Sequence, residues 1–174
     1  GGIGLSGLMA TKAFECKNII AVDVSDEKLT LAKEFGATHT INALNSNVLE
    51  EINIITDGVG VDYSIDAGGK VETIELAFES VKNNGGLSIF ASHPEAGKKI
   101  SIDPFNLILG KNIKGSWGGA CNPDKDIPLL ANLYDKGLMP LEKLVTKKYR
   151  LDEINLALDD LKHLKVFRPL IVIN

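Results

Sequence analysis

The chain has 174 residues and a formal net charge of −4, with 44% hydrophobic and 24% charged residues. This composition is typical of a globular domain and excludes a disordered, collagen-like or low-complexity protein. No run approaches the roughly 20 apolar residues that span a bilayer, and the acidic balance argues against a nucleic-acid-binding surface, which needs clustered positive charge. Two cysteines are too few for a disulfide scaffold or a four-thiolate zinc site.

The chain begins inside a glycine loop, Gly1 to Gly4, of the kind that normally follows a strand. We therefore expect the fold to be N-terminally truncated before or within this loop, with its first strand missing. Neighbouring strands would then expose unpaired backbone groups. The isolated chain is expected to be unstable or to take a strand from another chain.

Beyond the loop, predicted strands and helices alternate. Apolar runs predict strands at 19–24, 38–41, 61–66 and 87–92, the first of them buried on both faces. Helices are predicted at 5–14, from Ser25 or Asp26 to a stop at Gly36, and at 48–56 and 71–81. This alternation predicts an α/β fold with a doubly wound parallel sheet, the Rossmann arrangement.

The alternation loosens after residue 117. Helices are predicted at 124–135 and 152–164, and strands at 144–149 and 169–173. The prolines at 123–128 mark the place where the chain leaves the sheet. We accordingly divide the chain into residues 1–119, a dinucleotide-binding domain that lacks its first strand, and residues 120–174, a C-terminal segment.

The loop Gly1-Gly2-Ile3-Gly4 matches the last four positions of a G-x-G-x-x-G motif. In that motif one glycine lets the backbone approach a pyrophosphate, and the last lets the helix pack close to the strand. The alternative is an ordinary turn at the start of a helix. Asp23 favours the motif, because it lies 19 residues after Gly4 at the end of the next strand, where the acid that binds the adenosine ribose belongs.

A carboxylate at Asp23 would accept hydrogen bonds from the ribose hydroxyls and repel a 2′-phosphate, which predicts NAD rather than NADP. The alternative role for Asp23 is to cap the following helix. An S-adenosylmethionine-dependent methyltransferase shares this half-motif and remains a rival. A short-chain dehydrogenase does not fit, because the residues four after the tyrosines are Ala67, Leu138 and Glu153 rather than lysine.

Several motifs together make the whole chain resemble the C-terminal, NAD-binding portion of a zinc-dependent medium-chain alcohol dehydrogenase, closest to the classical alcohol and glutathione-dependent formaldehyde branch. They are Gly2-Ile3-Gly4-Leu5-Ser6, Ala21-Val22-Asp23-Val24 with Lys28, Ala32-Lys33-Glu34-Phe35-Gly36-Ala37-Thr38, Gly58-Val59-Gly60-Val61-Asp62, Lys114-Gly115-Ser116-Trp117-Gly118-Gly119, Asp126-Ile127-Pro128 and Phe167-Arg168-Pro169.

The resemblance implies a set of cofactor-binding residues in addition to the loop: Asp23 and Lys28 at the adenosine ribose, Lys70 near the adenine, Phe90, Ser92 and the main chain of Trp117 around the nicotinamide, and Arg168 at the pyrophosphate. Each has a plainer alternative. Lys28 and Arg168 would be exposed surface cations, and the side chains of Phe90 and Trp117 would pack in the core. Lysine in place of arginine at position 70 cannot stack as a guanidinium does.

The resemblance also implies a reaction, oxidation of an alcohol to an aldehyde or ketone with NAD, assisted by zinc whose ligands lie outside this chain. We expect Cys16 and Cys121 to be buried or half-buried thiols, and His39, His93 and His163 lack ligand spacing. The chain alone should be inactive. A homodimer or homotetramer would form through edge segments at 99–102 and 112–114, in the cytoplasm. The alternative is a non-catalytic dinucleotide-sensing domain.

Overall fold

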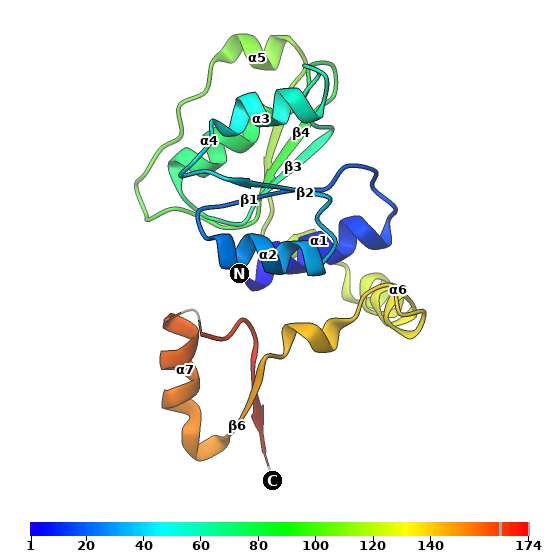
Figure 1. Ribbon diagram of the computed structural model, residues 1–174, viewed down its shortest axis with the longest axis vertical. Coiled ribbons are helices and arrows are strands. Elements are labelled where there is room, and N and C mark those ends of the chain that lie inside the picture. The colour runs from blue at the N-terminus through cyan, green and yellow to red at the C-terminus, as the bar shows by residue number, and fades with distance from the viewer. Residues whose placement is uncertain (164, 174) are drawn as a thin grey trace.

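The computed structural model describes residues 1–163 and 165–173, and its elements alternate as predicted (Figure 1). The first part of the chain contains α1 (Gly2–Ala13), β1 (Ile20–Asp23), α2 (Asp26–Glu34), β2 (His39–Asn42), α3 (Val48–Ile55), β3 (Tyr63–Asp66), α4 (Val71–Ser80), β4 (Leu87–Phe90), α5 (Pro104–Ile108) and β5 (Asn112–Gly115). The second part contains η1 (Gly118–Ala120), α6 (Pro123–Asp135), η2 (Leu141–Leu144), β6 (Lys147–Arg150), η3 (Leu151–Glu153), α7 (Ile154–Lys162) and β7 (Pro169–Val172).

The strands form three parallel groups, β1–β2, β3–β4–β5 and β6–β7. Ile20 lies opposite His39 in the first group, and Tyr63 lies opposite Leu87 in the second. Parallel strands joined through helices confirm the predicted α/β class and the Rossmann-like arrangement.

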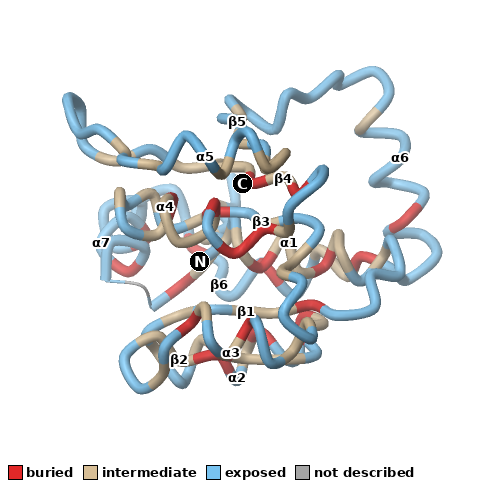
Figure 2. Tube along the Cα trace, turned by 90° about the horizontal axis from the view of Figure 1, so that it is seen from above, coloured by how far each residue is buried: buried red, intermediate tan, exposed pale blue. Residues whose placement is uncertain are grey.

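Within the described residues, β1 and β3 are not hydrogen-bonded to each other. Figure 2 shows the N-terminus between the β1–β2 and β3–β5 groups. A Cβ on Gly4 would lie 3.7 Å from Cβ of Ala67, just after β3, so the start of α1 contacts the end of that strand. This position is where we expect the missing first strand to end, and that expectation stays a prediction.

The prediction that residues 19–24 are buried on both faces is wrong for part of the run. Ile19 is buried, but Val22 and Val24 are 41% and 55% exposed. Tyr63 and Ile65 of β3 are exposed as well. The physical reason is that β1 pairs only with β2, and β3 only with β4, in the described chain, so one edge of each strand has no neighbour against which to pack.

Three apolar clusters stabilise the chain, and their buried residues are among the red segments of Figure 2. The first contains Leu5, Met9, Phe35, Leu133, Met139 and Leu144, the second Ile41, Val48 and Ile52, and the third Tyr149, Ala157 and Val166. The first cluster joins α1 to α6 and η2, so residues on both sides of the predicted boundary at 119 pack together. That boundary itself stays a prediction.

Element boundaries differ from the predictions in identifiable ways. The first helix begins at Gly2 rather than at residue 5, and the strand predicted at 144–149 is β6, preceded by η2. Residues 99–102 form no strand, so the expected edge segment there is wrong, whereas 112–114 lies in β5. Helix α5 was not predicted, although Asp103 caps it and Pro104 opens it. The predicted end of the last helix, residue 164, lies outside the described residues.

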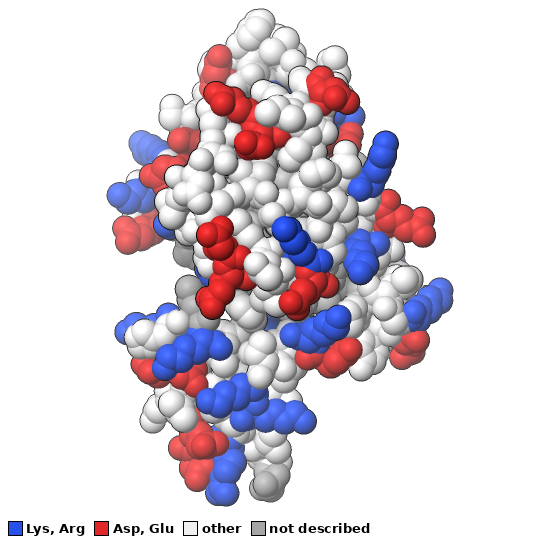
Figure 3. Space-filling model, viewed as in Figure 1, with Lys and Arg blue, Asp and Glu red and all other residues white. Residues whose placement is uncertain are grey.

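Gly36 ends α2 as predicted, because its φ of +115° suits glycine alone and Phe35 is the C-cap. Among the described residues, no helix has the length and apolar character needed to cross a membrane. On the face shown in Figure 3, acidic and basic side chains are interspersed, and basic ones lie most densely over the lower part.

Candidate nucleotide-binding site

The predicted glycine loop forms the first turn of α1. The first helical hydrogen bond runs from the Leu5 N–H to the Gly1 carbonyl at 3.0 Å. A Cβ on Gly2 would lie 3.0 Å from Nε of Arg168 and 3.5 Å from the carbonyl oxygen of Phe167. Gly2 therefore allows a segment near the C-terminus to approach the start of the helix. The helix N-terminus and the guanidinium together offer N–H donors and positive charge to an anion.

Asp23 ends β1 and holds its carboxylate with the adjacent backbone. Its Oδ1 accepts hydrogen bonds from the N–H groups of Val24 at 2.8 Å and Ser25 at 3.1 Å. Nζ of Lys28 lies 3.9 Å from the same oxygen. Among the described residues, none donates a hydrogen bond to Oδ2. One carboxylate oxygen is therefore fixed by the fold while the other remains available to a ligand.

The alternative role of Asp23, capping the next helix, is wrong. Ser25 is the N-cap of α2, and its Oγ accepts a hydrogen bond from the Lys28 N–H at 3.4 Å. The loop and the acid are also electrostatically close. Gly1 lies within electrostatic range of both Lys28 and Asp23. The glycine loop, Asp23 and Lys28 thus meet at one edge of the sheet.

A second part of the site lies where β3 ends. Asp66 is buried, and its two carboxylate oxygens accept hydrogen bonds from the N–H groups of Gly68 at 3.2 Å and Gly69 at 3.0 Å. Gly69 has a φ of +67°, and a Cβ there would lie 2.9 Å from Cβ of Ser92. The loops after β3 and β4 are therefore in close contact. Lys70 follows directly as the N-cap residue of α4.

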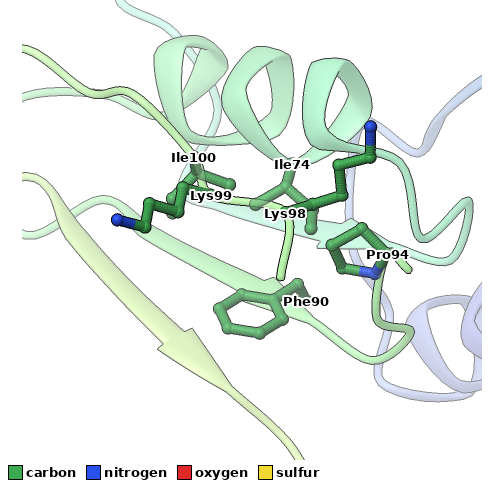
Figure 4. Close-up of a pocket in the computed structure, with 6 residues that line it drawn as sticks. All are labelled: Ile74, Phe90, Pro94, Lys98, Lys99 and Ile100. Atoms are coloured by element: carbon green, nitrogen blue, oxygen red, sulfur yellow. The ribbon is translucent and has the colours of Figure 1, made fainter. Parts of the chain in front are cut away.

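Phe90 ends β4 and packs over β5, because a Cβ on its neighbour Gly115 would lie 2.8 Å from the Phe90 ring. A cavity of about 470 Å³ lies on another side of Phe90. Figure 4 shows Ile74 and Phe90 lining it, with the ammonium groups of Lys98 and Lys99 directed away. Of the predicted cofactor residues, Phe90 alone is among those that line this cavity. The cavity is therefore separate from the glycine loop.

Trp117 follows β5, and its side chain is 91% exposed. The alternative that this side chain packs in the core is therefore wrong. The structure thus groups the predicted residues into one set around the glycine loop, with Asp23, Lys28 and Arg168, and another at the ends of β3 and β4, with Lys70, Phe90 and Ser92. The contact between Gly4 and Ala67 joins the two sets.

The sequence predictions did not assign Asp66 or Gly69 a role at this edge. Asp66 fixes the turn after β3, and Gly69 allows the contact with Ser92. The signal that could have identified both is an acid at the end of a predicted strand, followed one residue later by two glycines.

No group of three or more histidine, cysteine or acidic residues in the described chain could hold a metal ion. Both cysteines are exposed rather than buried or half-buried as predicted. A hydrogen bond with Asp126 raises the pKa of the Cys121 thiol, aided by desolvation. The residues described here do not fit a zinc site of the kind that thiolate and imidazole ligands build.

Comparisons with known proteins agree with this geometry. A family model described as zinc-binding dehydrogenase matches residues 2–136. An S-(hydroxymethyl)glutathione dehydrogenase from Paracoccus denitrificans is 36% identical over 165 residues, which is 91% of this chain and 44% of that relative.

Two crystal structures are similar over almost the entire chain. A benzyl alcohol dehydrogenase from Acinetobacter calcoaceticus has a TM-score of 0.92 at 35% identity, covering 99% of this chain and 47% of its own. An alcohol dehydrogenase zinc-binding domain protein from Burkholderia ambifaria has a TM-score of 0.92 at 33% identity, covering 98% and 46%. The chain spans slightly less than half the length of these relatives. The match over residues 2–136 shows that the chain belongs to the zinc-binding dehydrogenase family.

Proposed function

We propose that this chain is the NAD-binding portion of an alcohol dehydrogenase that oxidises an alcohol to an aldehyde or ketone. The observation that carries the proposal is the meeting of the glycine loop, Asp23 and Arg168 at one edge of the sheet. Nucleotides bind at the carboxyl ends of strands in doubly wound folds, against a helix N-terminus. Family membership and the named relatives support a dehydrogenase over the methyltransferase alternative.

The proposal assigns the adenosine ribose to Asp23. Its open Oδ2 would accept hydrogen bonds from the ribose hydroxyls, while the backbone donors to Oδ1 keep the carboxylate in place. A 2′-phosphate would meet this negative charge, so NAD is favoured over NADP. Lys28 would add a cation close to the same hydroxyls.

The pyrophosphate is assigned to the start of α1, with Arg168 beside Gly2. Lys70 would face the adenine from the N-cap of α4, without the stacking of a guanidinium. Phe90, Ser92 and the main chain around Trp117 would surround the nicotinamide end. These assignments follow the family resemblance and stay proposals.

In the reaction, NAD would accept the hydride from the alcohol. The residues of this chain would bind and orient the nucleotide. As the family resemblance implies, the zinc ligands would lie outside this chain, and these residues alone would give no turnover. The alcohol or aldehyde substrate, the cytoplasmic location and a homodimer or homotetramer stay predictions from the sequence.

The test is calorimetric titration of NAD and NADP into the protein that carries this chain, as wild type and as Asp23→Asn. We expect NAD to bind more tightly than NADP, and the substitution to weaken NAD by roughly tenfold to a hundredfold, because hydrogen bonds to a charged acceptor are lost. Asp26→Asn, three residues away in the first turn of α2, is the matched control and should leave the affinity unchanged. The proposal would be contradicted if wild type bound NAD and NADP equally well and if Asp23→Asn bound both nucleotides with the same affinity as wild type.

A further inference from the structure

A buried carboxylate outside the proposed site connects three segments of the C-terminal unit, which we define as β6, η3, α7 and β7 (residues 147–172). Asp160 lies on α7 and is only 5% exposed. Its Oδ2 accepts hydrogen bonds from the Tyr149 hydroxyl at 2.7 Å and from Nζ of Lys147 at 3.1 Å, both on β6. Its Oδ1 accepts one from Nζ of Lys165 at 3.1 Å. Both oxygens are thus engaged within the protein.

These contacts make Asp160 an anchor rather than a group that meets a ligand. Buried carboxylates persist where they are paired and hydrogen-bonded, and this one has three donors. The donors hold the pKa of Asp160 at about 2, so the carboxylate is ionised at neutral pH. Tyr149 also packs in the third apolar cluster, with Ala157 and Val166. The anchor therefore joins α7 to β6 inside the small core of the unit.

Lys165 extends the anchor towards the proposed nucleotide site. Its N–H donates a hydrogen bond to the Asp160 carbonyl at 2.9 Å, in addition to the contact through its ammonium group. The next residue, Val166, is buried, and the Phe167 N–H donates to Oγ1 of Thr146 at 3.2 Å. The segment 165–168 is therefore held at successive residues before β7 begins. At its end, Nε of Arg168 lies 3.0 Å from the position of a Cβ on Gly2.

We propose that Asp160 is a positioning residue for nucleotide binding: by holding Lys165, it keeps the segment 165–168 in place so that Arg168 stands beside Gly2 at the pyrophosphate. The inference rests on the proposed function. Figure 1 shows the C-terminal unit below α1 and α2, with β7 paired to β6, and Arg168 and Phe167 are the residues that approach Gly2 of α1. A carboxylate on α7 would in this way influence a contact made at the first turn of α1.

The test separates positioning from general stability by using ligands with and without the pyrophosphate. In the protein that carries this chain, affinities for NAD, ADP and adenosine are measured for wild type, Asp160→Asn, Lys165→Met and Arg168→Ala. We expect Asp160→Asn and Lys165→Met to weaken NAD and ADP by roughly threefold to thirtyfold, and to leave adenosine unchanged. Lys165→Met keeps the test decisive if Asp160→Asn does not fold, because the Lys165 side chain is 61% exposed.

Combined variants test whether Asp160 acts on nucleotide binding through Arg168. Adding Lys165→Met to Arg168→Ala should cause no further loss of NAD affinity, since the group being positioned is already absent. Asp159→Asn, on the same helix and paired with His163 at the surface, is the matched control and should have no effect.

An additive loss in the combined variant, or an equal loss for adenosine and ADP, would overturn the inference while leaving the proposed function intact. A wild-type protein that binds none of these ligands would overturn both. Normal NAD affinity in Lys165→Met together with weakened affinity in Arg168→Ala would overturn the positioning role alone.

Discussion

The sheet edge around Asp23 and the C-terminal unit around Asp160 each depend on one aspartate, but the two carboxylates are used differently. Asp23 has one oxygen engaged by backbone N–H groups and a lysine near it, with its second oxygen open. Asp160 has both oxygens occupied by side chains and is buried. The acceptor capacity that remains after folding, rather than the presence of an acid, distinguishes a carboxylate able to bind a ligand from one that stabilises the fold.

The two regions also differ in how their cores are built. In the sheet region, helix α4 buries Ile74 and Phe78, which are 2% and 0% exposed. In the C-terminal unit, the buried cluster is smaller and lies next to the Asp160 anchor. Substitutions should therefore destabilise the first region by loss of packing and the second by loss of hydrogen bonds.

The largest effect should come from the packing of the sheet region. Phe78→Ala would leave a cavity under β3 and β4, and we expect a loss of about 3–5 kcal/mol in the free energy of unfolding. Denaturant unfolding followed by circular dichroism measures this. Phe105→Ala is the control, because Phe105 is 56% exposed and its removal should change the stability little. Similar losses for the two variants would contradict the contrast in packing.

A smaller effect is expected in the C-terminal unit. Tyr149→Phe removes the hydroxyl that donates to Asp160 and leaves the ring in its cluster. We expect the melting temperature to fall by a few degrees, because a buried charged acceptor loses a donor. Tyr134→Phe is the matched control, since the Tyr134 side chain is 45% exposed. An unchanged melting temperature for Tyr149→Phe would show that the anchor does not stabilise the unit.

Acid should remove the stabilisation that the Asp160 carboxylate provides. The Asp160 pKa in the folded protein is about 2, below its ordinary value of 3.8, so the unfolded state takes up the proton first. The stabilisation is fully present above the ordinary pKa and is lost as pH falls towards 2. Melting temperatures between about pH 5 and pH 2 should fall less steeply for Asp160→Asn than for wild type. Parallel curves for the two proteins would contradict this assignment.

The smallest effect is expected from a surface ion pair of the sheet region. Nζ of Lys82 lies 2.5 Å from Oδ1 of Asp62, and the side chain of Asp62 is 69% exposed. Exposed pairs are screened by solvent and ions, so Lys82→Met should change the melting temperature hardly at all. If Lys82→Met lowered the melting temperature as much as Tyr149→Phe does, this exposed ion pair would contribute more to stability than its exposure to solvent predicts.

Local patterns in the sequence were sufficient to predict most of the sheet region. Alternating apolar runs and a glycine stop located β1, α2, β2 and β4 to within a few residues, because those signals are carried by neighbouring residues. Short elements set by caps or tertiary packing, such as α5 and η2, were missed. Exposure was harder to predict, since Val22 and Trp117 depend on which segments lie next to them.

The candidate site likewise combines features that local sequence patterns predict with features that depend on tertiary contacts. The spacing of Gly4 and Asp23 predicted that both lie at the same edge of the sheet, because one helix and the strand after it, α1 and β1, separate them. The contact of Arg168 with Gly2 joins opposite ends of the chain, and only the resemblance to a family indicated it before the structure. The support of that contact by Asp160 and Lys165 depends on side-chain geometry that no sequence pattern describes.

The most direct test of the proposed nucleotide site is a crystal structure of the protein that carries this chain, grown with NAD. We expect the adenosine ribose hydroxyls at hydrogen-bonding distance from Oδ2 of Asp23, and the pyrophosphate against the first turn of α1 with Arg168 beside it. A nucleotide bound elsewhere, for example with its adenine in the cavity beside Phe90 and Ile74 (Figure 4), would contradict the central claim.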